Sequence, residues 1–303
     1  MTYIINKFFN HKKYLESKEN KKKLIFKKYF FSVIKPVLIK NLKILKEKKE
    51  VSFLHSGHLG DVINSLPLIK EISKKKICKL YIEVEKPLPK IKNILNHPSG
   101  NYFINNNSAK KLLPLLKSLK YLNKVDIYNK QKIDINLNFF REMSLNFNID
   151  SVRWYFHLTG IHADLTKPYV QAKKNEKYKN SIVIMRSLRR QNPLINYNFL
   201  NKYKNLLFLG LYDEFLDLKK NIKSLKYYDS KSFLELASII KSCRVFIGNL
   251  SFGYALAEAI KCKRLLESGP NFPLIYPNGE NAYDFYYQEH FENLFKKIYS
   301  IKN

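Results

Sequence analysis

The chain has 303 residues, a net charge of +30 and 45% hydrophobic residues. This apolar content supports true hydrophobic cores and excludes a disordered chain, and the length suits one large or two ordinary domains. The cysteines Cys78, Cys243 and Cys262 form no CxxC pair, which argues against a zinc site or a disulfide framework and fits a reducing cytoplasm.

Residues 1–50 are predicted to form a basic helical extension in front of the first domain. Pro36 suits a helix start, and apolar residues follow it at helical spacing: Val37, Leu38, Leu42 and Leu45. The start shows no secretory signal, and the apolar stretch at 29–39 is too short to span a bilayer. Two alternatives stay open, a helix on an anionic membrane surface or a helix packed on the domain.

The next segment combines a strand, a polar loop and a helix. The apolar run 51–54 predicts a buried strand, and the pattern from Asp61 to about residue 75 predicts an amphipathic helix. Gly57 and Gly60 let the loop turn tightly and let another molecule approach its backbone. Asp61 stands in the first helical turn, beside unpaired N–H groups. Because open α/β sheets hold ligands at such loops, we expect a binding site here.

Strands and helices then alternate twice along the chain. The first series has strands at 78–84, 125–128 and 133–137 and helices at 109–122 and 149–158, and it ends in a polar linker at 168–179. The second has strands at 181–185, 206–209, 244–247 and 264–267 and helices at 214–221, 232–242 and 252–261. Such alternation predicts parallel sheets covered on both faces. We therefore expect an α/β protein with two Rossmann-like domains facing a cleft, at 51–170 and 171–303.

Two patches resemble a known family. Residues 59–67, LGDVINSLP, resemble the first strand-to-helix turn of bacterial heptosyltransferases, which belong to glycosyltransferase family 9 and have the GT-B fold. Residues 233–249, FLELASIIKSCRVFIGN, are similar to a family helix that runs into a strand ending in F-I-G-N/D. The resemblance implies an inverting transfer of sugar from a nucleotide-sugar donor to a hydroxyl of a cell-surface glycan or lipopolysaccharide-type acceptor. It implies no cofactor. The sequence contains no Asp-x-Asp motif, which many glycosyltransferases use to hold a metal, so a metal is not indicated.

The resemblance implies that Asp61 is the general base that activates the acceptor hydroxyl. A helix N-terminus favours the ionised carboxylate, although Asp is also a common helix cap. His58 and His55 are alternative bases or phosphate donors, since imidazole titrates near neutral pH. The same segment supplies the other residues predicted to bind substrate, which are Ser56, Gly57, Gly60 and Asn64.

The nucleotide sugar is expected at the second sheet. Arg186, Arg189 and Arg190 follow the strand at 181–185, and arginine binds phosphate oxygens bidentately. The next predicted helix offers N–H groups to an anion at its start, near Asn249, Ser251, Phe252 and Gly253. Ser251 either donates to the ligand or caps the helix. The resemblance implies that Glu258 binds the donor ribose, the alternative being an ordinary surface glutamate.

The chain departs from the family pattern at two positions. Asn249 stands where heptosyltransferases usually carry the Asp that contacts the heptose, and Tyr254 where they often carry His, which puts ADP-heptose in doubt as the donor. Two other functions stay open: a basic nucleic-acid-binding protein, suggested by the charge and the 43 aromatic residues, or an inactive GT-B-like binding protein. No nucleic-acid-binding signature is present. We expect a cytoplasmic enzyme, peripheral on the inner face of the membrane, with a glycan or glycolipid acceptor.

Overall fold

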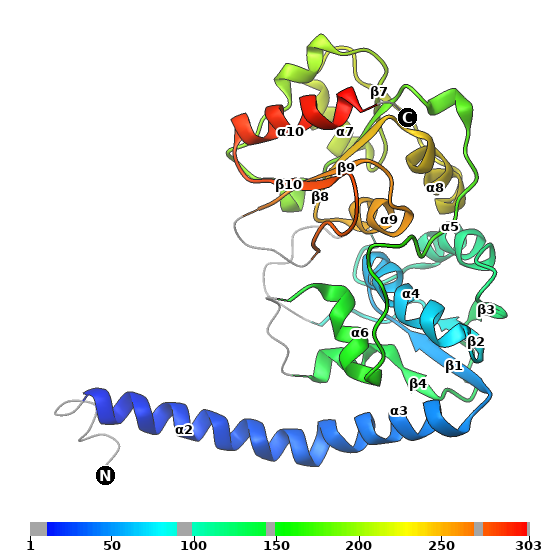
Figure 1. The fold of residues 1–303 in the computed structure, drawn as a ribbon, viewed down its shortest axis with the longest axis vertical. Coiled ribbons are helices and arrows are strands. Elements are labelled where there is room, and N and C mark those ends of the chain that lie inside the picture. Colours follow the sequence, from blue (N-terminus) through cyan, green and yellow to red (C-terminus); the bar gives the residue numbers. More distant parts are fainter. Residues whose placement is uncertain (1–10, 90–98, 144–148, 270–274, 302–303) are drawn as a thin grey trace.

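The computed structural model describes residues 11–89, 99–143, 149–269 and 275–301. In this part of the chain two parallel β-sheets, each flanked by helices, lie one above the other, and a long N-terminal helix runs beneath them (Figure 1). The predicted α/β fold with two Rossmann-like domains is confirmed. The boundary near residue 170 stays a prediction.

The N-terminal sheet runs in the order β3-β2-β1-β4, with all strands parallel. Its strands are β1 (Glu50–His55), β2 (Ile77–Ile82), β3 (Lys124–Ile127) and β4 (Ile135–Asn136). The helices are α4 (Leu59–Ser73), α5 (Asn106–Lys117) and α6 (Ser151–Thr159), with a 3₁₀ segment η2 (Leu137–Glu142) directly after β4. The strand order reverses between β1 and β4, so the loops after these two strands part at a topological switch point.

The C-terminal sheet runs in the order β10-β9-β8-β5-β6-β7, which is the Rossmann order read from its far edge. The strands are β5 (Ile182–Met185), β6 (Leu206–Phe208), β7 (Lys226–Tyr227), β8 (Val245–Asn249), β9 (Arg264–Glu267) and β10 (Ala282–Phe285). The helices are α7 (Tyr212–Lys219), α8 (Phe233–Ser242), α9 (Phe252–Ile260) and α10 (Gln288–Ser300), with 3₁₀ turns η3 (Glu176–Tyr178), η4 (Leu188–Arg190) and η5 (Asn198–Lys202). Here the order reverses between β5 and β8.

Three elements were not predicted: the short edge strand β7 and the last two elements of the chain, which follow the final predicted strand at 264–267. Strand β10 follows it and pairs with β9 at the sheet edge. Only Phe285 of β10 is buried, so no apolar run marks this strand. Helix α10 carries a clear apolar stripe of Phe291, Phe295 and Ile298, all buried. This helical spacing of apolar residues would have allowed α10 to be predicted from the sequence.

One hydrophobic core crosses from the first domain into the second. It contains Phe53 and Leu66 of the N-terminal domain together with Phe246 and Leu256 of the C-terminal domain. Helix α4 packs on α9, and α5 packs on α8. A methyl group at Gly60 would lie 3.9 Å from Phe252 Cα, an ordinary van der Waals distance, so the start of α4 lies directly against the start of α9. The domains are therefore joined by packed helices and not by the linker alone.

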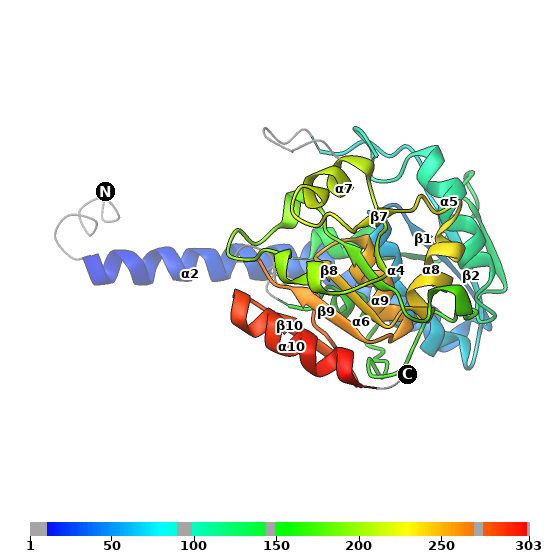
Figure 2. The same cartoon turned by 90° about the horizontal axis from the view of Figure 1, so that it is seen from above.

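The extension is a single run of helix, formed by α2 (His11–Tyr29), a π-helical turn η1 (Phe30–Ile34) and α3 (Lys35–Glu47). Helix α3 packs against α6. It buries Leu45, and its buried Asn41 donates a hydrogen bond from Nδ2 to the Leu158 carbonyl over 2.9 Å. The packing alternative therefore holds for α3. Helix α2 buries no residue and projects from the body (Figure 2). No helix in the described residues is long and apolar enough to cross a bilayer.

Candidate active site

Two adjoining cavities lie between the domains, with volumes of about 650 Å³ and about 300 Å³. They share wall residues from both domains: Leu59, Ser108, Arg189, Ser251 and Phe252. The loops after β1, β4, β5 and β8 all contribute to the smaller cavity. Both switch points therefore open onto one space, which is where doubly wound sheets hold ligands.

Asp61 lines the smaller cavity together with Arg189 and Arg190. Its Oδ2 accepts hydrogen bonds from the His58 N–H, over 3.1 Å, and from Arg141 Nη2, over 2.6 Å. No described residue donates a hydrogen bond to Oδ1. The structure thus brings the predicted base and two of the three predicted arginines into one cavity, and it leaves one carboxylate oxygen available.

Arg141 was not singled out in the sequence. It belongs to η2 after β4, next to the loop that carries Asp61. Its guanidinium lies 4.7 Å from the centroid of the Phe103 ring and 4.8 Å from that of Phe140. The two aromatic rings fix the cation beside Asp61. The sequence offered one signal for Arg141: it follows β4, the strand that pairs with β1 at the switch point.

His55 is fully buried and does not reach the cavity, although the sequence predicts that it binds substrate. Its Nδ1 accepts a hydrogen bond from the Gly57 N–H, so the proton of the neutral ring sits on Nε2, which donates to the Tyr155 hydroxyl over 3.0 Å. That hydroxyl donates to the Asp61 carbonyl over 2.9 Å. Burial lowers the pKa of His55 to about 4. The buried ring therefore supports the start of α4, and its role as a base or substrate ligand stays a prediction.

Ser56 and Gly57 also support the loop from within. The Ser56 N–H donates to Asn138 Oδ1 over 3.0 Å, and Lys86 Nζ donates to the Ser56 hydroxyl over 3.1 Å. A methyl group at Gly57 would lie 2.8 Å from Asp61 Oδ2 and 2.8 Å from His55 Cε1. The glycine thus leaves the space that the carboxylate occupies. Neither Ser56 nor Gly57 lines the two cavities, and their contact with substrate stays a prediction.

His58, Gly60 and Asn64 do line the smaller cavity. Burial lowers the pKa of His58; Asp61 opposes this effect, while Arg141 and Arg189 add to it. Asn64 donates from Nδ2 to Ser151 Oγ over 2.7 Å, and its buried Oδ1 has no partner among the described residues. This amide oxygen can accept a hydrogen bond from a ligand.

The turn η4 presents Arg189 to both cavities and Arg190 to the smaller one. No described residue forms an ion pair with Arg189 within 4.0 Å, and burial lowers the pKa of its guanidinium against the opposing charge of Glu214. A half-buried arginine without an ion-pair partner is suited to hold an anion.

The start of α9 supplies the facing wall, with Ser251, Phe252 and Gly253. Ser251 occupies the cap position, but its side chain makes no capping hydrogen bond. A methyl group at Gly253 would overlap Met185 Sδ, so glycine is needed where the helix starts beside β5. The first N–H groups of this helix are a second feature that favours an anion.

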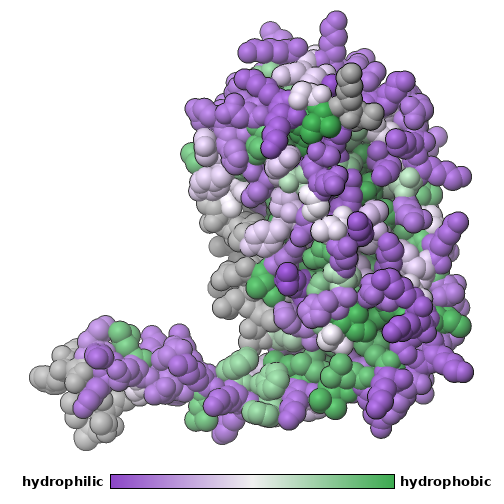
Figure 3. All heavy atoms as spheres, viewed as in Figure 1, coloured by the Kyte–Doolittle hydropathy of each residue, from purple (hydrophilic) through white to green (hydrophobic). Residues whose placement is uncertain are grey.

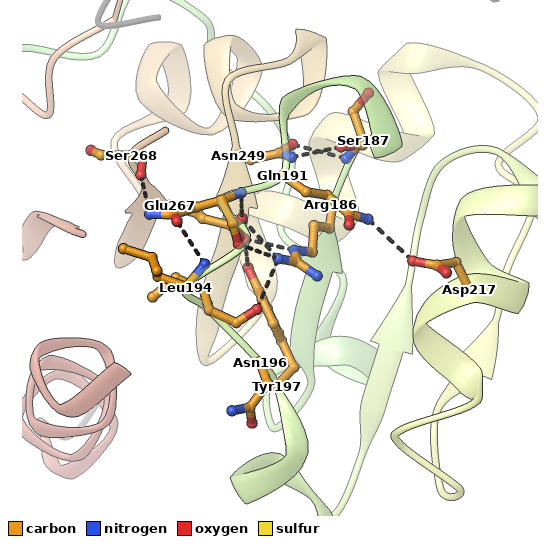
Figure 4. Close-up of polar contacts among 12 residues, drawn as sticks. Arg186, Ser187, Gln191, Leu194, Asn196, Tyr197, Asp217, Asn249, Glu267 and Ser268 are labelled. Atoms are coloured by element: carbon orange, nitrogen blue, oxygen red, sulfur yellow. Dashed lines mark hydrogen bonds and ion pairs between the residues drawn. The ribbon is translucent and has the colours of Figure 1, made fainter. Parts of the chain in front are cut away.

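Arg186 points away from the cavities, although the sequence predicts that it binds phosphate. It is buried, and its Nε and Nη2 donate to the two carboxylate oxygens of Glu267 over 2.7 and 2.9 Å (Figure 4). The Tyr197 hydroxyl donates to the same carboxylate over 2.8 Å. Because Nε and Nη2 both bind interior acceptors, Arg186 does not line the two cavities, and its binding of phosphate stays a prediction.

Asn249 and Glu258 are likewise engaged in the interior. Asn249 Oδ1 accepts from the Ser187 N–H over 2.8 Å, and its Nδ2 donates to the Ser187 carbonyl over 2.7 Å. The Glu258 carboxylate accepts from Arg264 Nε over 2.6 Å and forms an ion pair with Lys261. Neither side chain lines the two cavities, and their contacts with the nucleotide sugar stay predictions.

Glu214 is one of two carboxylates that line the larger cavity, the other being Asp229, and the sequence analysis did not single it out. It stands in the first turn of α7, where its Oε2 accepts from the Leu211 N–H over 3.2 Å. Burial raises its pKa. Its signal was a glutamate at the start of the helix after β6, at the same sheet edge as Arg189. At the cavity rim an ion pair joins the domains, between Lys111 and Asp229 at 3.1 Å.

No protein-family model matches the chain, and no curated protein matches it in sequence. Solved structures do match. A glycosyl transferase of family 9 from Veillonella parvula is 12% identical, with a TM-score of 0.51 over 84% of this chain and 90% of that one. The E. coli ADP-heptose lps heptosyltransferase II is 11% identical, with a TM-score of 0.53 over 78% of this chain and 90% of that one. The chain has the GT-B fold.

In this GT-B protein the two cavities occupy the space between the facing domains. The larger one is within the range of about 300–1,000 Å³ that is usual for small-molecule sites. Among the described residues no group of three or more His, Cys, Asp or Glu side chains is placed to hold a metal ion. The charged groups that line the cavities are instead arginines, lysines and single carboxylates.

Proposed function

We propose that this protein is an inverting, metal-independent glycosyltransferase that moves a sugar from a nucleotide-sugar donor to a hydroxyl of a cell-surface glycan or lipopolysaccharide-type acceptor. The observation that carries the proposal is that Asp61 of one domain and Arg189 of the other line a single cavity at two switch points. A base and an anion-binding group on opposite walls are what a sugar transfer from a diphosphate needs. The GT-B fold supports the same function.

The donor diphosphate would lie between Arg189 and the start of α9, with Arg190 close by. Both arginine charge and helix N–H groups favour an anion. Glu214, in place of Glu258, would accept hydrogen bonds from the ribose hydroxyls, because it lines the larger cavity and the other carboxylate there, Asp229, is paired with Lys111. The E. coli structure is named for ADP-heptose, so ADP-sugars are the first donors to test.

The acceptor would enter the smaller cavity beside Asp61. Its hydroxyl oxygen attacks the anomeric carbon from the face opposite the diphosphate, the bond from that carbon to the diphosphate oxygen breaks, and the hydroxyl proton passes to Asp61 Oδ1. Arg141 holds Oδ2 and so fixes the direction of the other oxygen. Asn64 Oδ1 would accept a hydrogen bond from a second acceptor hydroxyl.

The proposal is tested by Asp61→Asn, which keeps the shape of the side chain but removes its basicity. Loss of a general base costs about 10²–10⁴-fold in turnover, so we expect transfer and slow donor hydrolysis to fall by that factor while donor affinity, measured by calorimetry, stays within threefold. Asp126→Asn on β3 is the matched control, because this carboxylate is exposed and outside both cavities. Equal turnover in the two variants would contradict the role of Asp61.

A thermal-shift screen against nucleoside diphosphates separates the alternatives. A ligand at a hundred times its dissociation constant adds about 2.7 kcal/mol to the free energy of unfolding. Stabilisation without turnover of any nucleotide sugar would favour an inactive binding protein. Salt-sensitive RNA retention without stabilisation by nucleotides would favour nucleic-acid binding.

A further inference from the structure

The N-terminal arm, which we define as residues 11–34 (α2 and η1), extends beyond the folded body (Figures 1 and 2). In the described part of the chain its contacts with the body lie at its C-terminal end, where the Tyr29 hydroxyl donates to Glu142 Oε2 over 3.1 Å and Ile34 is buried. No residue of α2 is buried. The arm is thus a helix held at one end, with the rest of its surface open.

Large apolar side chains of the arm lie in water. Leu24, Ile25 and Phe26 expose 59%, 58% and 48% of their surface, and Phe31 exposes 59%. Figure 3 shows hydrophobic and hydrophilic residues side by side along this projecting helix. Clustered exposed apolar side chains of this size are unusual in a monomer and indicate a surface that another molecule covers.

The net charge of the arm indicates the charge of the molecule that covers it. The arm carries eight lysines against two glutamates, a net charge of +6. The lysines nearest the apolar cluster are Lys21, Lys22, Lys23, Lys27 and Lys28. Two such helices repel each other, which disfavours a second copy of the chain as the partner. The partner is therefore anionic.

The apolar cluster distinguishes a lipid surface from a nucleic acid. Leu24 and Ile25 gain nothing from a phosphate backbone, and aliphatic side chains do not stack on bases as aromatic ones do. They gain free energy when they enter the boundary between headgroups and acyl chains, while lysine stems extend their ammonium groups to the headgroups.

We propose that the N-terminal arm docks on an anionic phospholipid surface, with its apolar cluster inserted at the headgroup boundary and its lysines on the lipid phosphates. The arm lies outside the cavities between the domains, so this inference does not depend on the proposed sugar transfer. It would hold the protein at the membrane through the extension and leave the cavities free.

The test is co-sedimentation of the full chain with vesicles of phosphatidylcholine alone or with 30% phosphatidylglycerol, an anionic fraction of about a third. We expect binding to the anionic vesicles only, weakened by added salt. Changing Lys21, Lys22, Lys23, Lys27 and Lys28 to Gln should weaken binding about a hundredfold, since each basic residue near a charged surface contributes severalfold. The triple change of Leu24, Ile25 and Phe26 to Ser keeps the charge and should weaken it about tenfold or more.

The matched control changes five lysines of the C-terminal domain to Gln: Lys202, Lys204, Lys220, Lys223 and Lys226. It makes the same change in net charge and should bind like the unchanged chain. All three variants should keep the melting temperature, because the altered side chains are outside the core. Equal loss in the control and the arm variant would overturn the proposal. So would a dimer that the triple change dissociates, or RNA binding by a chain that ignores anionic vesicles.

Discussion

Arg186 and Arg189 stand three residues apart in the loop after β5, and their surroundings are opposite. Arg186 exposes 7% of its surface and is bound at two points by Glu267. Arg189 lines both cavities and has no ion pair among the described residues. The residue next to the strand end turns into the domain, whereas the residue in the following 3₁₀ turn reaches the cleft. Position relative to the strand end, and not residue type, separates the two roles.

The same difference recurs at the other loops. His55 ends β1 and is buried, while Asp61 in the first turn of α4 lines the smaller cavity. Asn249 ends β8 and is buried, while Ser251 at the start of α9 lines both cavities. In each pair the residue at or next to the strand end is buried, and the later residue lines a cavity.

The strongest test of this contrast is Arg186→Met. Removing one partner of a buried ion pair leaves Glu267 uncompensated, which costs about 3–5 kcal/mol of unfolding free energy. Urea denaturation followed by circular dichroism measures this loss. The double change Arg186→Met with Glu267→Leu should recover part of it. A loss under about 1 kcal/mol accompanied by weaker nucleotide binding would place Arg186 in the site and break the comparison.

Arg189→Met is the counterpart at the cleft. Its unfolding free energy should stay within about 0.5 kcal/mol of the unchanged chain, as is usual for residues outside the core. The dissociation constant for a nucleoside diphosphate should rise about 10- to 100-fold, the equivalent of one or two charge-assisted hydrogen bonds. Calorimetric titration gives this number, and Arg189→Lys should retain part of the affinity. Unchanged binding by the Met variant would remove Arg189 from the donor site.

Asn249→Asp introduces the residue that heptosyltransferases usually carry at the corresponding position. The change replaces the Nδ2 donor by an oxygen that faces the Ser187 carbonyl. We expect an unfolding free energy lower by about 1–3 kcal/mol, the usual cost of an unsatisfied buried group. Asn249→Ala gives the reference for loss of both hydrogen bonds without the repulsion. Higher transfer from ADP-heptose in the Asp variant, with stability kept, would show that this side chain can face the sugar.

Glu214→Gln has the smallest expected effect, which is a change in how nucleotide affinity depends on pH. Burial raises the pKa of Glu214 above its usual 4.5, so the carboxylate takes up its proton at a higher pH than an exposed one. Nucleotide affinity should fall on acidification as this oxygen loses its charge, and the Gln variant should lack that step. A raised carboxyl pKa means that the charged form costs stability at neutral pH. The Gln variant should therefore be at least as stable there, and an identical pH profile would exclude Glu214 from the site.

The strands of the two domains could be predicted because buried parallel strands are short apolar runs between turn residues. The edge strands β7 and β10 could not, since no residue of β7 and only Phe285 of β10 is buried. The loops that carry Asp61 and Arg189 were located from their place after strands. The interior positions of Arg186, Asn249 and Glu258 could not be predicted, because no sequence pattern tells whether a polar side chain turns towards the interior or the cleft. Their partners Glu267, Ser187 and Arg264 are distant in sequence or unremarkable in type.

The apolar core shared by Phe53 and Leu66 with Phe246 and Leu256 has a consequence for how this protein can change. Neither domain can be exchanged for the corresponding domain of another enzyme without exposing the apolar faces of α4 and α9. New substrate preferences would therefore arise by single substitutions in the loops around the cavities. An exchanged domain would first need a redesigned interface with its partner domain before the protein could fold.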